Sequence, residues 1–318
     1  MTVVILAALL ALLISIPVVE RSSTNPVEQY TDSWTKVNEN FLFSDRLADW
    51  DKHKKPPAIM RNLSEAEKAI DGMLKTLDDK YTRYYTRAEY TKRKQRAART
   101  NVVSWKMLPD NIGYIKINTF SSDNVASEVE DALNSMQGAE AYIVDLRGNG
   151  GGYVSQAFST FALFNESGVY ETHRGRKDGK AFEDCSVLTT NAMEEYSEGN
   201  LAESRSRPQN LAGDKPVVIL VNKNTASASE SFSGAMRFNR GAILVGETTF
   251  GKGIMQRTYA LDGGTAIKVT VAYIYQPDGN CIHNIGLEPD HSVDNSKRQD
   301  NQLNLAVEVA VNKVKAGN

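Results

Sequence analysis

Thr225-Ala226-Ser227-Ala228-Ser229-Glu230 is the stretch of this 318-residue chain that decides its fold. The apolar run 217–221 precedes it and has the composition of a fully buried strand. Residues 226–238 repeat apolar positions at helical spacing, so we expect Ser227 where a strand turns into a helix. Such a junction presents a side chain outward beside free backbone N–H groups, and this arrangement suits a nucleophile.

A second stretch of small residues, Phe250-Gly251-Lys252-Gly253, follows another apolar run. A serine hydroxyl is a weak nucleophile until a base removes its proton, and a lysine amine can be that base. Lys252 could also be a surface lysine in a turn, or the lysine of a phosphate-binding loop that 246–252 match. The phosphate loop is disfavoured because Gly253 stands where Ser or Thr should bind magnesium, and because 254–261 look like a strand rather than a helix.

A third segment, Arg147-Gly148-Asn149-Gly150-Gly151-Gly152, connects an apolar strand expected at 141–146 to a helix expected at 153–164. A glycine-rich turn of this kind points backbone N–H groups toward an anion. It can hold a nucleotide pyrophosphate, form an oxyanion hole, or be a tight turn only. The dinucleotide pattern GxGxxG fails because Tyr153 occupies the position of the third glycine.

Together the three segments resemble peptidase family S41, the carboxy-terminal processing (tail-specific) serine peptidases. The family's pattern is Asp-Leu-Arg-x-Asn-x-Gly-Gly, then Thr/Ser-Ala-Ser-Ala-Ser-Glu, then Gly-Glu-x-Thr-Phe-Gly-Lys-Gly-x-x-Gln. The chain matches these at 145–152, 225–230 and 246–256, with further matches at 77–84, 277–279, 286–290 and 300–303. The resemblance covers roughly residues 64–310.

The resemblance implies a serine endopeptidase that cleaves peptide bonds in unfolded or C-terminal segments through an acyl-enzyme. Carried over residue by residue, it implies that Ser227 is the nucleophile, Lys252 the general base and Gln256 the residue that orients the lysine. The oxyanion hole would be formed by the N–H groups of Ala228 and of Gly151 or Gly152. The alternative is a non-catalytic ligand-binding module on the same fold, as in the retinoid-binding repeats related to this family.

Gln256 follows Lys252 by four residues, and in a strand this separation returns a side chain to the same face. Some family members also use an aspartate in the helix after the serine. Residues 236–239 read Met-Arg-Phe-Asn, so that aspartate is missing and Gln256 must suffice.

A lysine base must be neutral at working pH, although its ordinary pKa is about 10.4. Burial without a carboxylate partner can lower a lysine pKa by ~3–5 units. The acids nearest in sequence are Glu247 and Asp262, and the mechanism requires that neither pairs with Lys252.

Strands alternate with helices from residue 111 onward, which is typical of an α/β layered fold. The family's crotonase/ClpP-like ββα fold agrees with this pattern. We expect five segments: a membrane anchor or signal (1–20), an N-terminal helical region (21–90), a basic linker (91–110), the protease core (111–293) and a C-terminal helix (294–318). Residues 174–215 contain few apolar runs and are expected to be a long polar excursion.

The PDZ domain that captures substrate C-termini in this family is missing from the sequence. Such a domain needs roughly 80–90 residues, and only about 20 separate Tyr90 from Asn111. These include a basic run at 92–99, which favours a solvated helix face or linker over contact with anionic lipid or an acidic partner. We therefore expect selection by the groove beside Ser227 and only long-range attraction from the basic run.

The N-terminus carries an apolar run from Val3 to Val19, broken only by Ser15 and Pro17. Its length fits either a short membrane span or a long signal-peptide core. No small-residue cleavage pattern follows, so an uncleaved anchor is favoured over a cleaved signal. Either would place the catalytic part outside the cytoplasm, exported or bound to the membrane.

The remaining composition limits the partners. The net charge of −2 does not suggest binding to nucleic acid, and the four histidines show no metal-ligand spacing, so neither a metal nor a cofactor is expected. His283 is the best placed histidine for an alternative Ser-His-Asp triad. Cys185 and Cys281 permit one disulfide in an oxidising compartment. The expected partners are protein or peptide substrates and the membrane. The sequence leaves open whether the chain forms a homo-oligomer.

Overall fold

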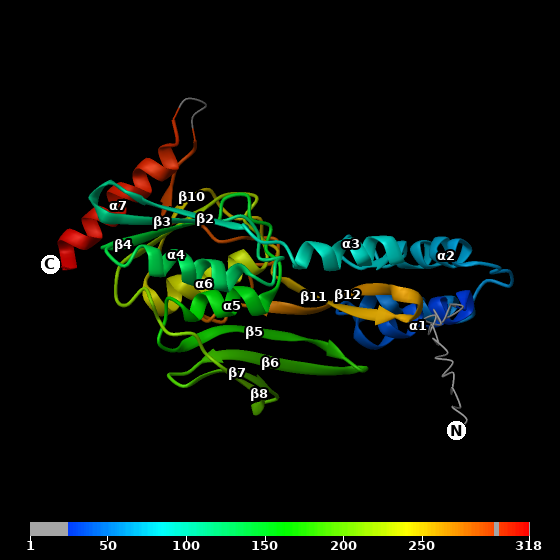
Figure 1. Cartoon of the computed structure of the whole chain (residues 1–318). Coiled ribbons are helices and arrows are strands. Elements are labelled where there is room, and N and C mark those ends of the chain that lie inside the picture. Colours follow the sequence, from blue (N-terminus) through cyan, green and yellow to red (C-terminus); the bar gives the residue numbers. More distant parts are fainter. Residues whose placement is uncertain (1–24, 296–298, 318) are drawn as a thin grey trace, which may run out of the picture.

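The computed structural model describes residues 25–295 and 299–317 and consists of a layered α/β core with a smaller helical unit beside it (Figure 1). The expected membrane anchor or signal at 1–20 lies outside the described residues. Within the described ranges, every helix is too short or too polar to span a bilayer.

The core is built on a six-stranded sheet with the order β13-β10-β9-β4-β3-β2. All neighbours pair in parallel except β2, which is antiparallel to β3. The strands are β2 Val103–Leu108, β3 Ile112–Ile117, β4 Ala141–Asp145, β9 Val217–Val221, β10 Ile243–Gly246 and β13 His291–Ser292. Parallel strands carry their carboxyl ends to one edge, so the loops after β4, β9 and β10 meet there.

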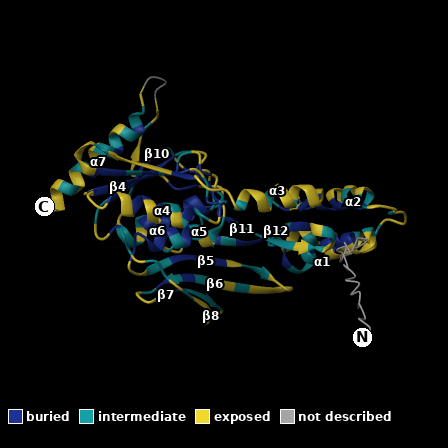
Figure 2. Ribbon diagram, in the orientation of Figure 1, coloured by how far each residue is buried: buried dark blue, intermediate teal, exposed yellow. Residues whose placement is uncertain are grey.

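Helices cover both faces of this sheet, and this explains why its central strands are uninterrupted apolar runs. Tyr142 and Val144 pack into a cluster with the three helices α4 Val125–Ser135, α5 Val154–Ala162 and α6 Ala228–Arg240. Ala141 and Ile143 of the same strand point to the other face, against α7 Asn301–Gly317. Figure 2 accordingly shows β4 in dark blue and the outer side of α7 in yellow.

A second, seven-stranded sheet lies beyond α4, α5 and α6. Its strands are β1 Arg83–Tyr85, β5 Gly168–Lys177, β6 Lys180–Leu188, β7 Ala192–Ser197, β8 Asn200–Ser206, β11 Ile254–Leu261 and β12 Thr265–Tyr275. The prediction of a polar excursion over 174–215 is therefore wrong, because β5 to β8 form an antiparallel meander. These strands are largely half-buried or exposed, and polar or charged residues interrupt their apolar positions, so the sequence shows no apolar run there.

The N-terminal unit packs around the far end of the β11–β12 ribbon (Figure 1). Helices α1 Pro26–Asn40 and α2 Leu63–Lys75 bury Trp34, Val37, Phe41 and Ile70 against β12. The unit also contains β1, which pairs with β12, and the start of α3 Arg87–Ala97.

The range 91–110 consists largely of regular structure. Thr86 and Glu89 form a reciprocal capping box that starts α3, so the basic run continues the helix to Ala97. Only residues 98–102 separate α3 from β2, which is the edge strand of the six-stranded sheet. The C-terminal helix begins at Asn301, later than the expected range 294–318.

Candidate functional site

Ser227 lies at the turn between β9 and α6, and its backbone adopts an unusual conformation. Its φ of 57° and ψ of −124° lie outside the regions that non-glycine residues ordinarily occupy. The helix therefore begins at Ala228, two residues later than the expected 226. The preceding turn is fixed by Thr225, whose hydroxyl donates to the backbone oxygen of Leu146 (2.9 Å) and accepts from the N–H of Asn222 (3.0 Å). Strain of this kind persists where the surroundings enforce it, and it is common at functional sites.

The fully buried carboxylate of Glu230 fixes this turn to the lysine segment. One oxygen accepts from the N–H groups of Ser227 (2.8 Å) and Lys252 (2.9 Å). The other accepts from the N–H of Gly251 (2.7 Å) and the hydroxyl of Thr249 (2.5 Å). Sequence reasoning gave Glu230 no role. The signal that could have identified it is its position three residues after Ser227, which is the acidic position of a capping box.

Lys252 lies in a positively charged environment. Its amine is 4.9 Å from the centre of the Tyr81 ring. Burial, together with the positive charges of Lys268 and Arg93, lowers the pKa of Lys252 to about 8. The negative charges of Glu230 and Asp79 act in the opposite direction and limit this decrease. Among the ion pairs of the described chain, none involves Lys252, and the two opposing acids are not the ones nearest in sequence.

A cavity of about 200 Å³ brings the expected site residues together. Ser227, Lys252, Gln256 and the glycines 150–152 all line it. Gln256 does not contact Lys252 by a hydrogen bond, because its side-chain amide donates to the backbone oxygen of Ile254 (3.2 Å). A β-bulge between Met255 and Gln256 disturbs the alternation of side chains on which the same-face prediction depended.

The glycine-rich loop packs directly against Ser227. A Cβ atom on Gly151 would lie 2.6 Å from the backbone oxygen of Ala226 and 3.0 Å from the Cβ of Ser227, so only glycine fits there. The N–H of Gly151 already donates to the side-chain oxygen of Asn149 (3.0 Å). In the described structure the N–H groups of Gly152 and Ala228 donate no hydrogen bond within the chain. Of the two glycines expected for an oxyanion hole, Gly152 is therefore the one with a free donor.

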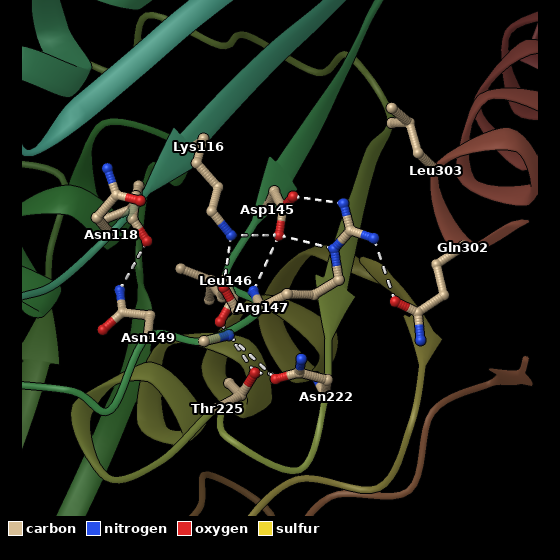
Figure 3. A network of polar contacts seen from close by, with 12 residues as sticks. Lys116, Asn118, Asp145, Leu146, Arg147, Asn149, Asn222, Thr225, Gln302 and Leu303 are labelled. Atoms are coloured by element: carbon tan, nitrogen blue, oxygen red, sulfur yellow. Dashed lines mark hydrogen bonds and ion pairs between the residues drawn. The ribbon is translucent and has the colours of Figure 1, made fainter. Parts of the chain in front are cut away.

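A network of charged groups anchors the start of this loop (Figure 3). The buried Asp145 accepts hydrogen bonds from Tyr114 (2.7 Å), Lys116 (2.9 Å) and Arg147 (2.7 Å). Arg147 also binds Asp300 (2.6 Å), next to the start of α7. Burial alone would raise the pKa of Asp145, but the bonds from Arg147 and the charge of Lys116 outweigh it and lower that pKa. The Asp-Leu-Arg segment at 145–147 thus holds the loop in place and lies outside the Ser227 cavity.

The alternative base His283 and the two cysteines do not line the cavity of Ser227. His283 packs behind Gly253 and against the ring of Tyr273, and it does not line the cavity. Its pKa is lowered by burial and by Lys80. Cys185 and Cys281 are free thiols, so the permitted disulfide is not formed. Over residues 25–295 and 299–317, no three His, Cys, Asp or Glu side chains gather as a metal site would require.

Comparison with known proteins identifies the core. The family model described as "Peptidase family S41" matches residues 111–293. A "Carboxyl-terminal-processing protease" of Synechocystis sp. is 37% identical over 186 residues, which is 58% of this chain and 38% of that protein. The "Carboxy-terminal processing protease CtpA" of Bacillus subtilis is 36% identical over 187 residues, or 58% of this chain and 35% of that protein. The match thus spans little more than a third of these relatives.

Two solved structures share the fold at low sequence identity. A photosystem II D1 C-terminal processing protease superposes with a TM-score of 0.62 at 19% identity, covering 85% of this chain and 94% of that one. A lipoprotein from Streptococcus agalactiae gives a TM-score of 0.62 at 14% identity, covering 92% of this chain and 96% of that one. At these identities the likeness supports the layered α/β fold.

Proposed function

The chain belongs to peptidase family S41, and from this premise we propose that it is a serine endopeptidase that cleaves unfolded or C-terminal segments of proteins. The observation that carries the proposal is the shared cavity of Ser227 and Lys252, in which the lysine has a pKa of about 8. The curated relatives named as processing proteases support the reaction type, while the substrates of this chain are part of the proposal.

The proposed reaction begins with proton transfer from the hydroxyl of Ser227 to the neutral amine of Lys252. The serine oxygen then bonds to the carbonyl carbon of the substrate, and the negative oxygen of the tetrahedral intermediate is held by the N–H groups of Ala228 and Gly152. The protonated Lys252 gives its proton to the leaving amine as the peptide bond breaks, which leaves an acyl-enzyme. Water, deprotonated by Lys252, releases the second product and restores the serine.

Three features support this assignment of roles. The bonds that Glu230 accepts from the backbones of Ser227 and Lys252 hold nucleophile and base in register without placing a carboxylate on the amine. The free N–H groups of Ala228 and Gly152 lie on the two segments that meet at Ser227. Gln256 lines the same cavity, and we assign it to orienting Lys252 once substrate displaces its bond to Ile254.

We also propose that the peptidase acts outside the cytoplasm and is held at the membrane by the apolar run from Val3 to Val19. In this proposal, residues 111–293 form the protease core and residues 21–90 form a helical region that supports it. Fractionation of cells that express the full chain, with protease added to intact cells, tests the location. The proposal would be contradicted if the added protease left the chain intact and the chain did not sediment with the membrane fraction.

The reaction itself is tested with a reduced and alkylated protein as unfolded substrate. The full chain should degrade it, and Ser227→Ala should not. A fluorophosphonate probe should label the wild-type chain on the peptide that contains Ser227, with labelling slowed in Lys252→Ala. Degradation by Ser227→Ala at the wild-type rate would contradict the proposed function, because the cleavage would then come from another site or a contaminant.

A further inference from the structure

A second cavity lies next to the one that contains Ser227. It has a volume of about 360 Å³, and Arg93 and Ser121 line both cavities. One wall is a single face of α3, since Glu89, Lys92, Arg93 and Arg96 follow one another at helical spacing. The other wall includes Tyr153, which directly follows the glycine loop. The basic face of α3 therefore lines a cavity that shares Arg93 and Ser121 with the cavity of Ser227.

This second cavity carries an excess of positive charge. Its charged lining consists of four cations and a single carboxylate: Arg83, Lys92, Arg93, Arg96 and Glu89. That carboxylate is already engaged, because Glu89 accepts from Arg83 (2.7 Å) and from the N–H of Thr86 (3.0 Å). In the described part of the chain, Lys92, Arg93 and Arg96 take part in no ion pair. The helix thus presents three cations that have no acidic partner among the described residues.

Arg93 lies over two aromatic rings. Its guanidinium lies 5.8 Å from the centre of the Tyr85 ring and 5.8 Å from that of Tyr153. Aromatic neighbours fix the plane of a guanidinium while leaving its N–H edge free for two parallel hydrogen bonds. Lys268, which shares the Ser227 cavity, has its pKa lowered to about 8 by burial and by the charges of Arg93 and Arg83. A negative group would relieve this repulsion.

We propose that Arg93, with Lys92 and Arg96 on the same face of α3, binds a carboxylate of the substrate chain while Ser227 acts on a peptide bond nearby. The inference rests on the proposed peptidase function and adds a specificity to it. The carboxylate comes from the end of the substrate chain or from an Asp or Glu side chain. Arg matches the planar carboxylate with two bonds, so the basic run makes a direct contact in addition to the long-range attraction expected from sequence.

The test uses one neutral unstructured peptide in three forms: with a free C-terminal carboxylate, with an amidated C-terminus, and amidated with one internal Asp. The full chain should show a higher kcat/KM on one or both carboxylate forms than on the amidated neutral form, by on the order of 10- to 100-fold. Which form is preferred identifies the source of the carboxylate. Arg93→Gln should abolish the preference, chiefly through KM.

Arg99→Gln is the matched control, because it removes the same charge just beyond α3 from a side chain that lines neither cavity. It should retain the preference. Comparing ratios between peptides also removes any effect of Arg93 on the pKa of Lys252, since that effect acts on every substrate alike. Equal cleavage of all three forms by the wild-type chain, or an equal loss of preference in both variants, would overturn the proposal.

A binding arm separates this inference from the proposed function. Fluorescence anisotropy of the same labelled peptides with Ser227→Ala should show tighter binding of a carboxylate form, and the addition of Arg93→Gln should remove the difference. If peptides bind in this pattern but the wild-type chain cleaves none, the peptidase proposal fails and the carboxylate site stands. If cleavage occurs with no such difference in binding or rate, the carboxylate site fails alone.

Discussion

Replacement of Glu230 by Gln probes how the structure holds nucleophile and base together. The carboxylate accepts four hydrogen bonds, two on each oxygen, in a fully buried position. Gln has nearly the same shape but offers one oxygen and one NH₂ group, so two donors must face a donor. The variant therefore changes the electrostatics at the centre of the site without creating a cavity.

The magnitude follows from the less costly of the two amide orientations. With NH₂ toward Thr249, that hydroxyl can rotate to accept, and only the N–H of Gly251 is left without a partner, which costs about 1–3 kcal/mol. The bonds from Ser227 and Lys252 persist but lose the charged acceptor, at roughly 1 kcal/mol each. Glu230→Gln should thus lower the free energy of unfolding by about 3–5 kcal/mol. A small displacement of the two segments should also reduce kcat by on the order of 100-fold.

The assay combines denaturant unfolding with peptide hydrolysis under conditions where circular dichroism shows a folded chain. Glu247→Gln is the matched control, because Glu247 is half-buried on the same segment and its side chain makes no hydrogen bond in the described structure. It should change the free energy of unfolding by less than about 0.5 kcal/mol. Equal stability and kcat for the two variants would refute the reasoning, because Glu230 would then not hold the segments in register.

Three further predictions follow from the site. Because a neutral Lys252 is required, kcat/KM should rise with pH along a single limb with an apparent pKa of about 8, and Lys252→Arg should be inactive since a guanidinium stays protonated; an active arginine variant would exclude general-base catalysis here. Asp145→Asn should cost about 3–5 kcal/mol, because Lys116 loses its carboxylate and Arg147 keeps only Asp300. Since the folded-state pKa of Asp145 is lowered, the wild-type chain alone should lose this stability as pH falls below the ordinary carboxyl range; parallel acid titrations followed by circular dichroism check this. Gly151→Ala should abolish hydrolysis in a chain that still unfolds cooperatively, because the added Cβ would lie 2.6 Å from a backbone oxygen beside Ser227, and an active alanine variant would show that this close packing is dispensable.

The buried parallel strands could be predicted from sequence because each is an unbroken apolar run covered on both faces. β9 has the predicted bounds Val217–Val221, and β4 differs by a single residue. The meander β5 to β8 could not be found this way, because its strands are largely half-buried or exposed and polar or charged residues interrupt their apolar positions. For the basic run, the sequence left open a solvated helix face or a linker, because the residues of α3 are mostly exposed and carry little apolar periodicity.

The site shows the same division between local and tertiary information. The strand-to-helix position of Ser227 follows from local pattern, and so does the close approach that Gly151 permits. The bond that Glu230 accepts from Ser227 is the capping-box bond that a local pattern can indicate, but its bonds from Gly251 and Lys252 join residues about 20 positions apart, and no local pattern reveals them. The orientation of Gln256 depends on a bulge in β11, and the cavity beside Arg93 depends on how α3 lies relative to Ser121 and Tyr153. Both arise only when distant segments meet.

The central claim is that Ser227 and Lys252 act as one catalytic unit, and a double-mutant cycle tests it most directly. kcat/KM is measured for the wild-type chain, Ser227→Ala, Lys252→Ala and the double variant on one unstructured peptide, with folding checked by circular dichroism. The account predicts that each single variant loses hydrolysis and that the double variant is no worse than either, since residues of one unit lose their effect together. Clear residual turnover in Lys252→Ala, with a further loss on adding Ser227→Ala, would contradict it and assign the base to another residue.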